Sequence, residues 1–429
     1  MNQPAPLIGA GPLLLFLLQV GALLLVALLL GRAAAALRMP PVVGELAAGL
    51  VLGPLVWLFP PDPAQFHLVD AVAQVGVLLL VGLTGAHLDL RLIRRQGATI
   101  ARLSAFGLAV PLAMGVAAGL MLPVSMRGPA DPAVFALFLG VAMCVSAIPV
   151  IAKTLHDMNL LHRNVGQLTL AAGMIDDAFG WLMLSVVSGM ATFGVRAGTV
   201  AGSVAALAGV LLVAVVVGRP LVRATFRLTG RYKDNSPTII GTAVIVLLSA
   251  AGTHALGMEP VLGAFVAGLL ISAAAPDPAR LAPLRTVVLG LLAPLYFATV
   301  GLRMDLGALA RPEVLWVAVV MVAVACAGKF LGAFLGSWTS RMNRWEGLAL
   351  GAGMNARGVI QVIVATVGLR LGVLTVEMYT IIILVAMITS VLAAPVLRLA
   401  MARVEQTAEE QARHAAQGRL ASPAKVSET

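Results

Sequence analysis

Charged residues are scarce in this chain. Only 11% of its 429 residues are Asp, Glu, Lys or Arg, whereas soluble globular proteins carry about 25%. Apolar residues make up 60% of the sequence, and the mean hydropathy is +0.99. This composition excludes a soluble globular domain. It predicts an all-α polytopic membrane protein, because backbone polar groups in lipid must find their partners within helices.

Cysteine and histidine are scarce as well. The two cysteines, Cys144 and Cys326, fall in apolar stretches and say little about a redox compartment. No two of the six histidines have the His-x-x-x-His spacing of a metal site, and no Cys-x-x-Cys occurs. We therefore expect no resident metal and no cofactor.

Long apolar runs are abundant. A membrane-spanning helix needs about 20 apolar residues, and counting such runs between charged or Pro/Gly-rich breaks gives thirteen predicted spans. They cover residues 10–30, 41–59, 71–87, 98–122, 132–152, 164–192, 198–218, 237–257, 259–275, 283–302, 312–337, 346–369 and 378–402.

Lys and Arg residues are concentrated in alternate loops. With the N-terminus outside, 22 of them fall in inside segments and five in outside segments, and omitting one span would reverse every later loop. The bias predicts an N-out, C-in protein of about thirteen helices in the inner (cytoplasmic) cell membrane. It also accounts for the net charge of +10, which is therefore no indication of nucleic-acid binding.

Part of the sequence is repeated. The stretch 39–50 returns at 258–269, 81–90 matches 297–306, and 140–143 more weakly echoes 351–354. Each pair of matching spans is seven helices apart, so the two copies have opposite orientations in the membrane. Inverted repeats of this kind are typical of secondary transporters, whose binding sites lie on discontinuous helices.

Two matching spans contain helix-breaking sequences. Pro149 removes a backbone donor in the middle of the span 132–152. Its repeat mate contains Gly-Ala-Gly-Met-Asn-Ala-Arg-Gly at 351–358, which is too polar and glycine-rich for an ordinary span. We predict two broken helices that cross near the middle of the membrane, although simple kinking for packing is the alternative.

Few charged residues lie within the spans. Away from the span ends, Glu45, Asp176 and Asp177 are the acidic residues that lie clearly within spans, and Lys329 and Arg357 are the basic ones. One ionised side chain at membrane depth costs about 3 kcal/mol, so two adjacent aspartates require a reason, and an exchanging proton or cation supplies one. Adjacent helical residues point about 100° apart, so only one aspartate can face Lys329 directly.

These motifs resemble the cation:proton antiporters, specifically their second, largely prokaryotic branch. The resemblance covers nearly the whole membrane portion. It is carried by Pro-Val-Val-Gly-Glu at 41–45, Ser-Ala-Ile-Pro-Val at 146–150, Ile-Asp-Asp at 175–177, Pro-Leu-Tyr-Phe at 294–297, Gly-Lys-Phe-Leu-Gly at 328–332 and Arg-Gly at 357–358.

The resemblance implies a membrane transport domain over residues 1–403 that forms a homodimer. It implies a core of residues 98–192 and 312–402, a dimerisation scaffold of 10–90 and 237–302, and a linker helix over 198–226. The remaining residues, 404–429, are expected to be a short cytoplasmic tail that is frayed or disordered.

The resemblance also implies roles for the embedded residues. Asp177 is the expected cation and proton carrier, and Asp176 is its neighbour in the site and the partner of Lys329. Three further polar residues lie on the crossing helices: Ser146, Asn355 and Arg357, of which Ser146 and Asn355 offer oxygens to a cation. Glu45 is a candidate for the cytoplasmic entrance, against the alternative of a simple helix-end residue.

The chain departs from the family pattern at two positions. Gln361 and His87 stand where many relatives carry acidic residues, which leaves the ion and the pH range open. The function that the resemblance implies is electrogenic exchange of a monovalent cation, Na⁺ first and Li⁺ or K⁺ as alternatives, for protons across the bilayer. A passive cation channel, or an antiporter of another solute on the same scaffold, remains open. An intramembrane aspartyl protease is disfavoured, because its two acids must face each other from different helices.

Overall fold

The computed structural model describes residues 9–37, 39–55, 63–86, 97–160, 162–194, 197–232, 234–274, 278–408 and 410–411. Within these ranges the chain is helical and has no strand; Arg127 and Leu374 form an isolated bridge between two loops. The helices are α1 (Ala10–Ala36), α2 (Pro41–Leu52), α3 (Pro63–Ala86), α5 (Gly97–Met121), η1 (Val124–Met126), α6 (Pro132–Cys144), α7 (Ile148–Asp157), α8 (Asn164–Phe193), α9 (Ala197–Val213), η2 (Ala214–Gly218), α10 (Arg219–Thr229), α11 (Ser236–Ala255), α12 (Pro260–Ala274), α13 (Pro278–Val287), η3 (Val288–Leu292), α14 (Ala293–Leu302), η4 (Gly307–Ala310), α15 (Pro312–Thr339), α16 (Arg344–Met354), α17 (Val359–Arg370) and α18 (Val376–Met401).

Every predicted span overlaps at least one of these helices. Nine of the described helices are long and apolar enough to cross a membrane, or ten if α16 and α17 form one bent span. The apolar helices α2, α6 and α12 are shorter than a full span. The chain is therefore a multi-pass membrane protein, while the total of thirteen crossings stays a prediction.

Among the predicted boundaries that were wrong are the end of the second span and the start of the third. Helix α2 ends at Leu52 rather than near residue 59, because Pro54, two residues later, has no backbone N–H with which to continue the helical hydrogen bonds. Helix α3 begins at Pro63, well before residue 71, with proline at the favoured first position. Asp70 lies inside this extension, where its charge is paired with Arg303 at 2.5 Å.

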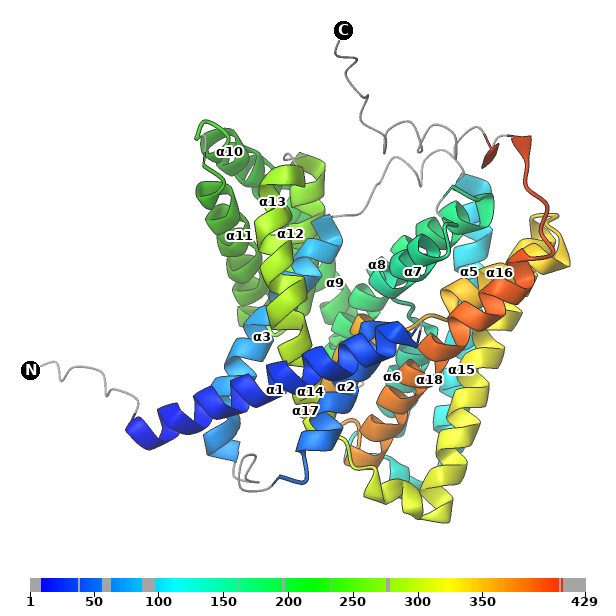
Figure 1. The fold of residues 1–429 in the computed structure, drawn as a ribbon, viewed down its shortest axis with the longest axis horizontal. Coiled ribbons are helices and arrows are strands. Elements are labelled where there is room, and N and C mark those ends of the chain that lie inside the picture. Colours follow the sequence, from blue (N-terminus) through cyan, green and yellow to red (C-terminus); the bar gives the residue numbers. More distant parts are fainter. Residues whose placement is uncertain are drawn as a thin grey trace, which may run out of the picture.

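The helices form two groups that lie side by side (Figure 1). In one group, α5 packs against α6, α8 and α15, and α16 packs against α8 and α18. In the other, α2 packs against α1 and α14, and α12 packs against α3 and α11. Figure 1 shows the green helices α10–α12 of the second group apart from the yellow and orange α15, α16 and α18 of the first.

The sequence repeat is also a repeat of packing. A Cβ added to Gly49 of α2 would lie 2.0 Å from the carbonyl oxygen of Ala298 in α14, and one added to the matching Gly268 of α12 would lie 2.2 Å from that of Gly82 in α3. Helix backbones thus touch directly at equivalent places. The other matching contacts are Gly301 with Leu46 O and Gly85 with Phe265 O, and Gly44 with Leu30 O and Gly263 with Ser249 O. We call the α2–α14 and α12–α3 contacts the glycine seams.

Both predicted helix breaks are present. Three residues, 145–147, separate α6 from α7, and 355–358 separate α16 from α17, which meet at a bend of 48°. The Ala147 backbone amide donates a hydrogen bond to Ala356 O at 3.1 Å, so the two breaks touch. We call these two breaks, with the helix ends beside them, the crossing. Backbone groups that leave the helical pattern here find partners inside the protein, as membrane depth requires.

Part of the predicted tail is anchored rather than frayed. The Arg163 guanidinium, just before α8, donates hydrogen bonds to Val404 O at 2.9 Å and to Glu405 O at 3.1 Å. The Glu410 carboxylate accepts a hydrogen bond from the Asn164 backbone amide at 2.6 Å. A carboxylate at the first residues of a helix also opposes the positive end of its dipole, which accounts for the docking. Residues 412–429 of the predicted tail lie outside the described residues.

Candidate functional site

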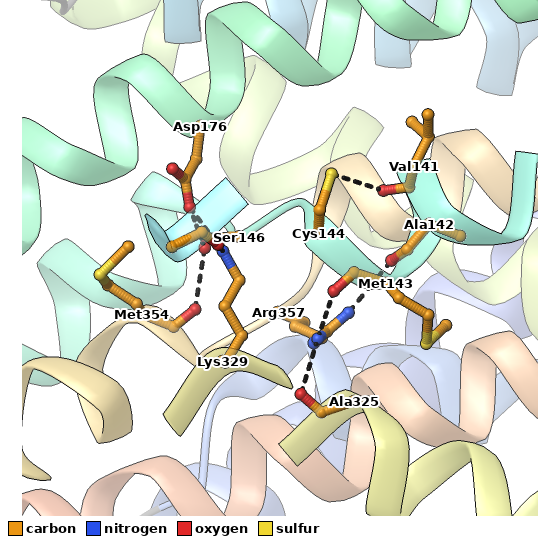
Figure 2. Close-up of polar contacts among 11 residues, drawn as sticks. Val141, Ala142, Met143, Cys144, Ser146, Asp176, Ala325, Lys329, Met354 and Arg357 are labelled. Carbon is orange, nitrogen blue, oxygen red and sulfur yellow. Dashed lines mark hydrogen bonds and ion pairs between the residues drawn. The ribbon is translucent and has the colours of Figure 1, made fainter. Parts of the chain in front are cut away.

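A buried ion pair lies beside the crossing (Figure 2). Lys329 Nζ of α15 is 2.6 Å from Asp176 Oδ2 of α8, and both side chains are fully buried. The same ammonium donates to Gly107 O of α5 at 3.1 Å. Ser146 Oγ, in the first break, is 2.8 Å from Asp176 Oδ2 and 2.8 Å from Met354 O. The structure thus brings Asp176, Lys329 and Ser146 together from three separate segments.

Asp177 has no such partners. Its side chain is fully buried, yet neither of its carboxylate oxygens has a hydrogen-bond partner in the part of the chain that the structure describes. The same holds for Oδ1 of Asp176. The 100° step along α8 separates the two neighbours: Asp176 points at Lys329, and Asp177 points away from that pair. Buried carboxylate oxygens without a hydrogen-bond donor are costly unless a proton or a cation occupies them.

Arg357 completes the polar network of the crossing. Its guanidinium donates hydrogen bonds to Ala142 O at 3.1 Å, Met143 O at 2.6 Å and Ala325 O at 3.2 Å (Figure 2). Two of these oxygens are the unsatisfied carbonyls at the C-terminal end of α6. The positive charge therefore offsets the negative end of the α6 dipole where the helix stops inside the protein.

Asn355 offers one further oxygen. Its side-chain amide nitrogen lies 3.6 Å from Cys326 Sγ, and its Oδ1 is buried without a hydrogen-bond partner in the described part of the chain. Asn355 directly follows α16, next to the Met354 carbonyl bound by Ser146. The unpaired oxygens of Asp176, Asp177 and Asn355 are all of the hard type that monovalent cations bind.

Some residues of interest lie elsewhere. Glu45 is half-buried on α2 beside Gly31 of α1, and no hydrogen bond joins it to Asp176 or Lys329 among the described residues. Gln361 is buried in α17, where it donates to Ile382 O at 3.2 Å. His87 lies outside the described residues. The described residues contain no group of three His, Cys, Asp or Glu that could hold a resident metal ion.

Ser390 belongs to this network but was not predicted from the sequence. The Ser390 hydroxyl of α18 donates a hydrogen bond to Arg357 O and so fixes the second break from the far side. The only sequence signal is the pair Thr389-Ser390 in an otherwise apolar stretch. Such hydroxyls usually bond the carbonyl one turn earlier in their own helix, as Thr389 does with Val385 O, so the long-range partner of Ser390 was not predictable.

Most of the chain is similar in sequence to known transport proteins. Residues 21–403 match the family model described as sodium/hydrogen exchanger, transmembrane. The chain is 29% identical over 398 residues to the Na(+)/H(+) antiporter NhaS4 of Synechocystis sp., covering 89% of this chain and 96% of that protein. It is 30% identical over 412 residues to Cation/H(+) antiporter 20 of Arabidopsis thaliana, covering 91% of this chain and 48% of that one. The chain thus spans about half the length of the Arabidopsis relatives.

A solved structure shares the fold. The sodium proton antiporter MjNhaP1 from Methanocaldococcus jannaschii superimposes with a TM-score of 0.66 at 18% identity, covering 91% of this chain and 99% of that one. At this identity the likeness concerns the fold alone. The family model, in contrast, covers most of the chain and includes every residue of the buried site. The chain belongs to the sodium/hydrogen exchanger family.

Proposed function

We propose that this protein is a secondary active antiporter that exchanges a monovalent cation, Na⁺ first, for protons. The main support for this proposal is Asp177, whose carboxylate is fully buried next to the Asp176–Lys329 pair and the crossing and has no hydrogen-bond donor among the described residues. The activities named for NhaS4 and for the Arabidopsis relatives support the same assignment. We propose a transporter and not an enzyme, with the cation and the proton as its substrates.

The mechanism follows from competition for the same oxygens. A dehydrated cation needs anionic oxygen ligands, and Asp177 supplies them only when it is deprotonated. Asp176 Oδ1, Asn355 Oδ1 and the Ser146 hydroxyl lie in the same network and complete the ligand set. A protonated Asp177 has no charge to offer, so loading of one substrate expels the other. An empty, ionised site is costly to carry through the membrane, which ties movement to loading.

Electrogenic exchange requires a second protonatable group. Asp177 alone exchanges one proton for one monovalent cation, and such a cycle moves no net charge. The Asp176–Lys329 pair is the second group: when the cation binds Asp176, the pair separates and the Lys329 ammonium gives up a further proton, which leaves the site. This proposal links the stoichiometry of two protons per cation to the 2.6 Å contact between Lys329 and Asp176.

We further propose that the two helix groups are the moving parts. Residues 98–192 and 312–402 form the core that carries the site, residues 10–90 and 237–302 form the scaffold and the homodimer interface, and 198–226 link them. The inner cell membrane, with the N-terminus outside, is the proposed location. Glu45 lies on the scaffold and guides cations at the cytoplasmic entrance.

Ion-driven proton movement in vesicles tests this function. The purified protein is reconstituted with an imposed pH gradient, and a pH-sensitive dye is followed on addition of Na⁺, Li⁺ or K⁺. We expect a cation-dependent signal that is lost in Asp177→Asn and in Asp176→Asn. Glu313→Gln is the matched control, because this exposed carboxylate at the start of α15 lies far outside the network.

The alternatives give different results in the same vesicles. A passive channel would conduct the cation in the absence of a pH gradient and would not drive protons uphill. An antiporter of another solute would give no signal with any of the three ions. A signal that persists in Asp177→Asn would reject Asp177 as the carrier.

A further inference from the structure

The two faces of α8 differ on the C-terminal side of the aspartates. Gly180, one turn after Asp176, packs against Val145 of the first break, where an added Cβ would lie 2.6 Å from Val145 Cγ1. Trp181, one turn after Asp177, instead contacts Phe265 of α12, with ring centroids 6.1 Å apart and ring planes tilted by 41°. The Asp176 face is therefore directed into the first helix group. The Asp177 face meets the second group one turn later, where Trp181 contacts Phe265.

The Asp177 face carries a row of buried polar atoms. Trp181, Ser185 and Ser188 follow Asp177 by four, eight and eleven residues, which places all of them within about a quarter of the helix circumference. Trp181 is 1% exposed, Ser185 5% and Ser188 3%. Trp181 Nε1, Ser185 Oγ and Ser188 Oγ have no hydrogen-bond partner among the described residues.

This row is unusual for helical serines. A buried Ser or Thr in a helix commonly bonds the carbonyl one turn earlier. On α8 itself Thr169 bonds Val165 O at 2.7 Å, and Thr192 bonds Ser188 O at 2.9 Å. Ser185 and Ser188 do not make this bond. Leaving several polar atoms buried and unpaired in a row costs free energy, which calls for an explanation.

We propose that Trp181, Ser185 and Ser188 line the second half of the ion route, from Asp177 toward the C-terminal end of α8, and that Trp181 against Phe265 closes this half in the present conformation. The ligand of the row is water and a hydrated monovalent cation, which the two hydroxyls can bind as donors and acceptors. The contact with Phe265 joins the moving group to the scaffold, so a shift of one group against the other opens the row. This inference rests on the proposed antiporter function.

Thiol labelling of single-cysteine variants tests the route. The chain has only Cys144 and Cys326, so Cys144→Ala/Cys326→Ala gives a background without thiols. Ser185→Cys and Ser188→Cys replace one small polar side chain by another. Val187→Cys is the matched control: Val187 is fully buried, and it lies two residues from Ser185 and therefore on the opposite, Asp176 face.

The variants are reconstituted and exposed to a positively charged, membrane-impermeant methanethiosulfonate while cation and proton gradients are imposed in either direction. The labelling rate follows the population of the open state, so we expect a rise of more than about tenfold when a gradient shifts that population from rare to common. Val187→Cys stays unlabelled. Labelling of Ser185→Cys and Ser188→Cys no faster than that of Val187→Cys under every gradient would overturn the proposal, and so would fast labelling that no gradient changes.

A second measurement uses the unaltered chain. Hydroxyl-radical footprinting detects water that reaches Trp181, and the exposed Trp316 and Trp338 serve as internal references. We expect oxidation of Trp181 to depend on the gradient, and no oxidation under any condition would overturn the route. Proton exchange, measured in the same vesicles, decides the proposed function separately from the labelling. If the vesicles exchange protons while the row stays inaccessible to label and water, the proposed route is rejected but the antiporter function is not.

Discussion

The glycine seams and the crossing are both backbone-to-backbone contacts at membrane depth, but they are built in opposite ways. At the seams, residues such as Gly49 and Gly268 bring helix backbones together without any charged group, and the contact repeats in both halves of the chain. At the crossing, the helices stop, the Arg357 guanidinium bonds the Ala142 and Met143 carbonyls at the end of α6, and the charged pair of Asp176 and Lys329 lies beside them. Some side-chain oxygens there have no hydrogen-bond partner among the described residues.

The seams and the crossing therefore differ in how firmly each holds a single geometry. A close-packed apolar contact holds one geometry, because any displacement opens a void or a clash. A network of buried charges holds its geometry only for particular protonation states, since adding or removing one proton changes every neighbouring interaction. We infer that the seams keep the scaffold fixed while the crossing responds to the substrate.

The largest expected effect comes from breaking the buried pair of the crossing. Lys329→Met keeps the length of the side chain but leaves Asp176 without its partner, and losing one member of a buried pair costs about 3–5 kcal/mol. The double variant Lys329→Met/Asp176→Asn removes both charges and should recover much of this loss. Unfolding in detergent measures both. Equal destabilisation in the single and double variants would show that the two side chains do not act as a pair.

The next largest effect on stability is expected at the glycine seams. Gly268→Ala places a methyl group 2.2 Å from Gly82 O, so the helices must separate, and such overpacking costs about 1–3 kcal/mol. Gly252→Ala in the neighbouring α11 has no atom within 4 Å and should instead stabilise by up to about 1 kcal/mol through helix propensity. Opposite signs in thermal unfolding are the expected result. Two stabilising substitutions would mean that the seam is not tightly packed.

The sequence could predict those features that depend on residue type and local neighbours. Composition determines that the chain is helical and membrane-spanning, and the recurrence of Gly44 and Gly49 as Gly263 and Gly268 reveals the repeat because only glycine fits these contacts. Pro149 and the glycines near residue 355 predict the breaks, since they weaken helices locally. These features depend on the residues themselves and their near neighbours.

Long-range polar partners could not be predicted in the same way. The contacts of Ser390 with Arg357 O and of Glu410 with the Asn164 amide join residues far apart in the chain, and neither has a local sequence signature. The sequence did not predict the extension of α3 to Pro63 for a related reason. A charged residue such as Asp70 usually marks the end of an apolar run, and its partner Arg303 is evident only in the structure. Charged residues at span ends are ambiguous from sequence alone.

A smaller effect is expected at the anchored tail, where charged side chains also hold a contact, but outside the membrane spans. Burial by itself raises the pKa of the Glu410 carboxyl, but the Asn164 and Thr407 amides and the Arg163 guanidinium outweigh it and hold the pKa below the ordinary 4.5. The contact is therefore fully present above about pH 4.5 and is lost as the pH falls through the lowered pKa. Hydrogen exchange of residues 404–411 should accelerate only in this acid range.

Glu410→Gln tests the same contact at neutral pH. The amide retains the shape of the side chain but loses the charge that faces Arg163 at 3.2 Å and the start of α8. We expect faster hydrogen exchange of the tail at pH 7, with the exchange of α15 unchanged. Glu405→Gln is the control, because the Glu405 side chain is exposed and only its backbone oxygen contacts Arg163. Equal acceleration in both variants would assign the effect to net charge rather than to docking.

The smallest effect is expected at an exposed ion pair with nearly the same geometry as the buried one. Arg311 Nη2 lies 2.8 Å from Glu377 Oε1, against 2.6 Å for Lys329 and Asp176, but the Arg311 side chain is 58% exposed and Lys329 is fully buried. Water and salt screen the exposed pair, so Arg311→Gln should change the unfolding free energy by no more than about 1 kcal/mol, and less at high salt. Distance alone would predict similar effects for Arg311→Gln and Lys329→Met. A ratio near one would thus refute the argument that burial, and not contact distance, makes the crossing sensitive to charge.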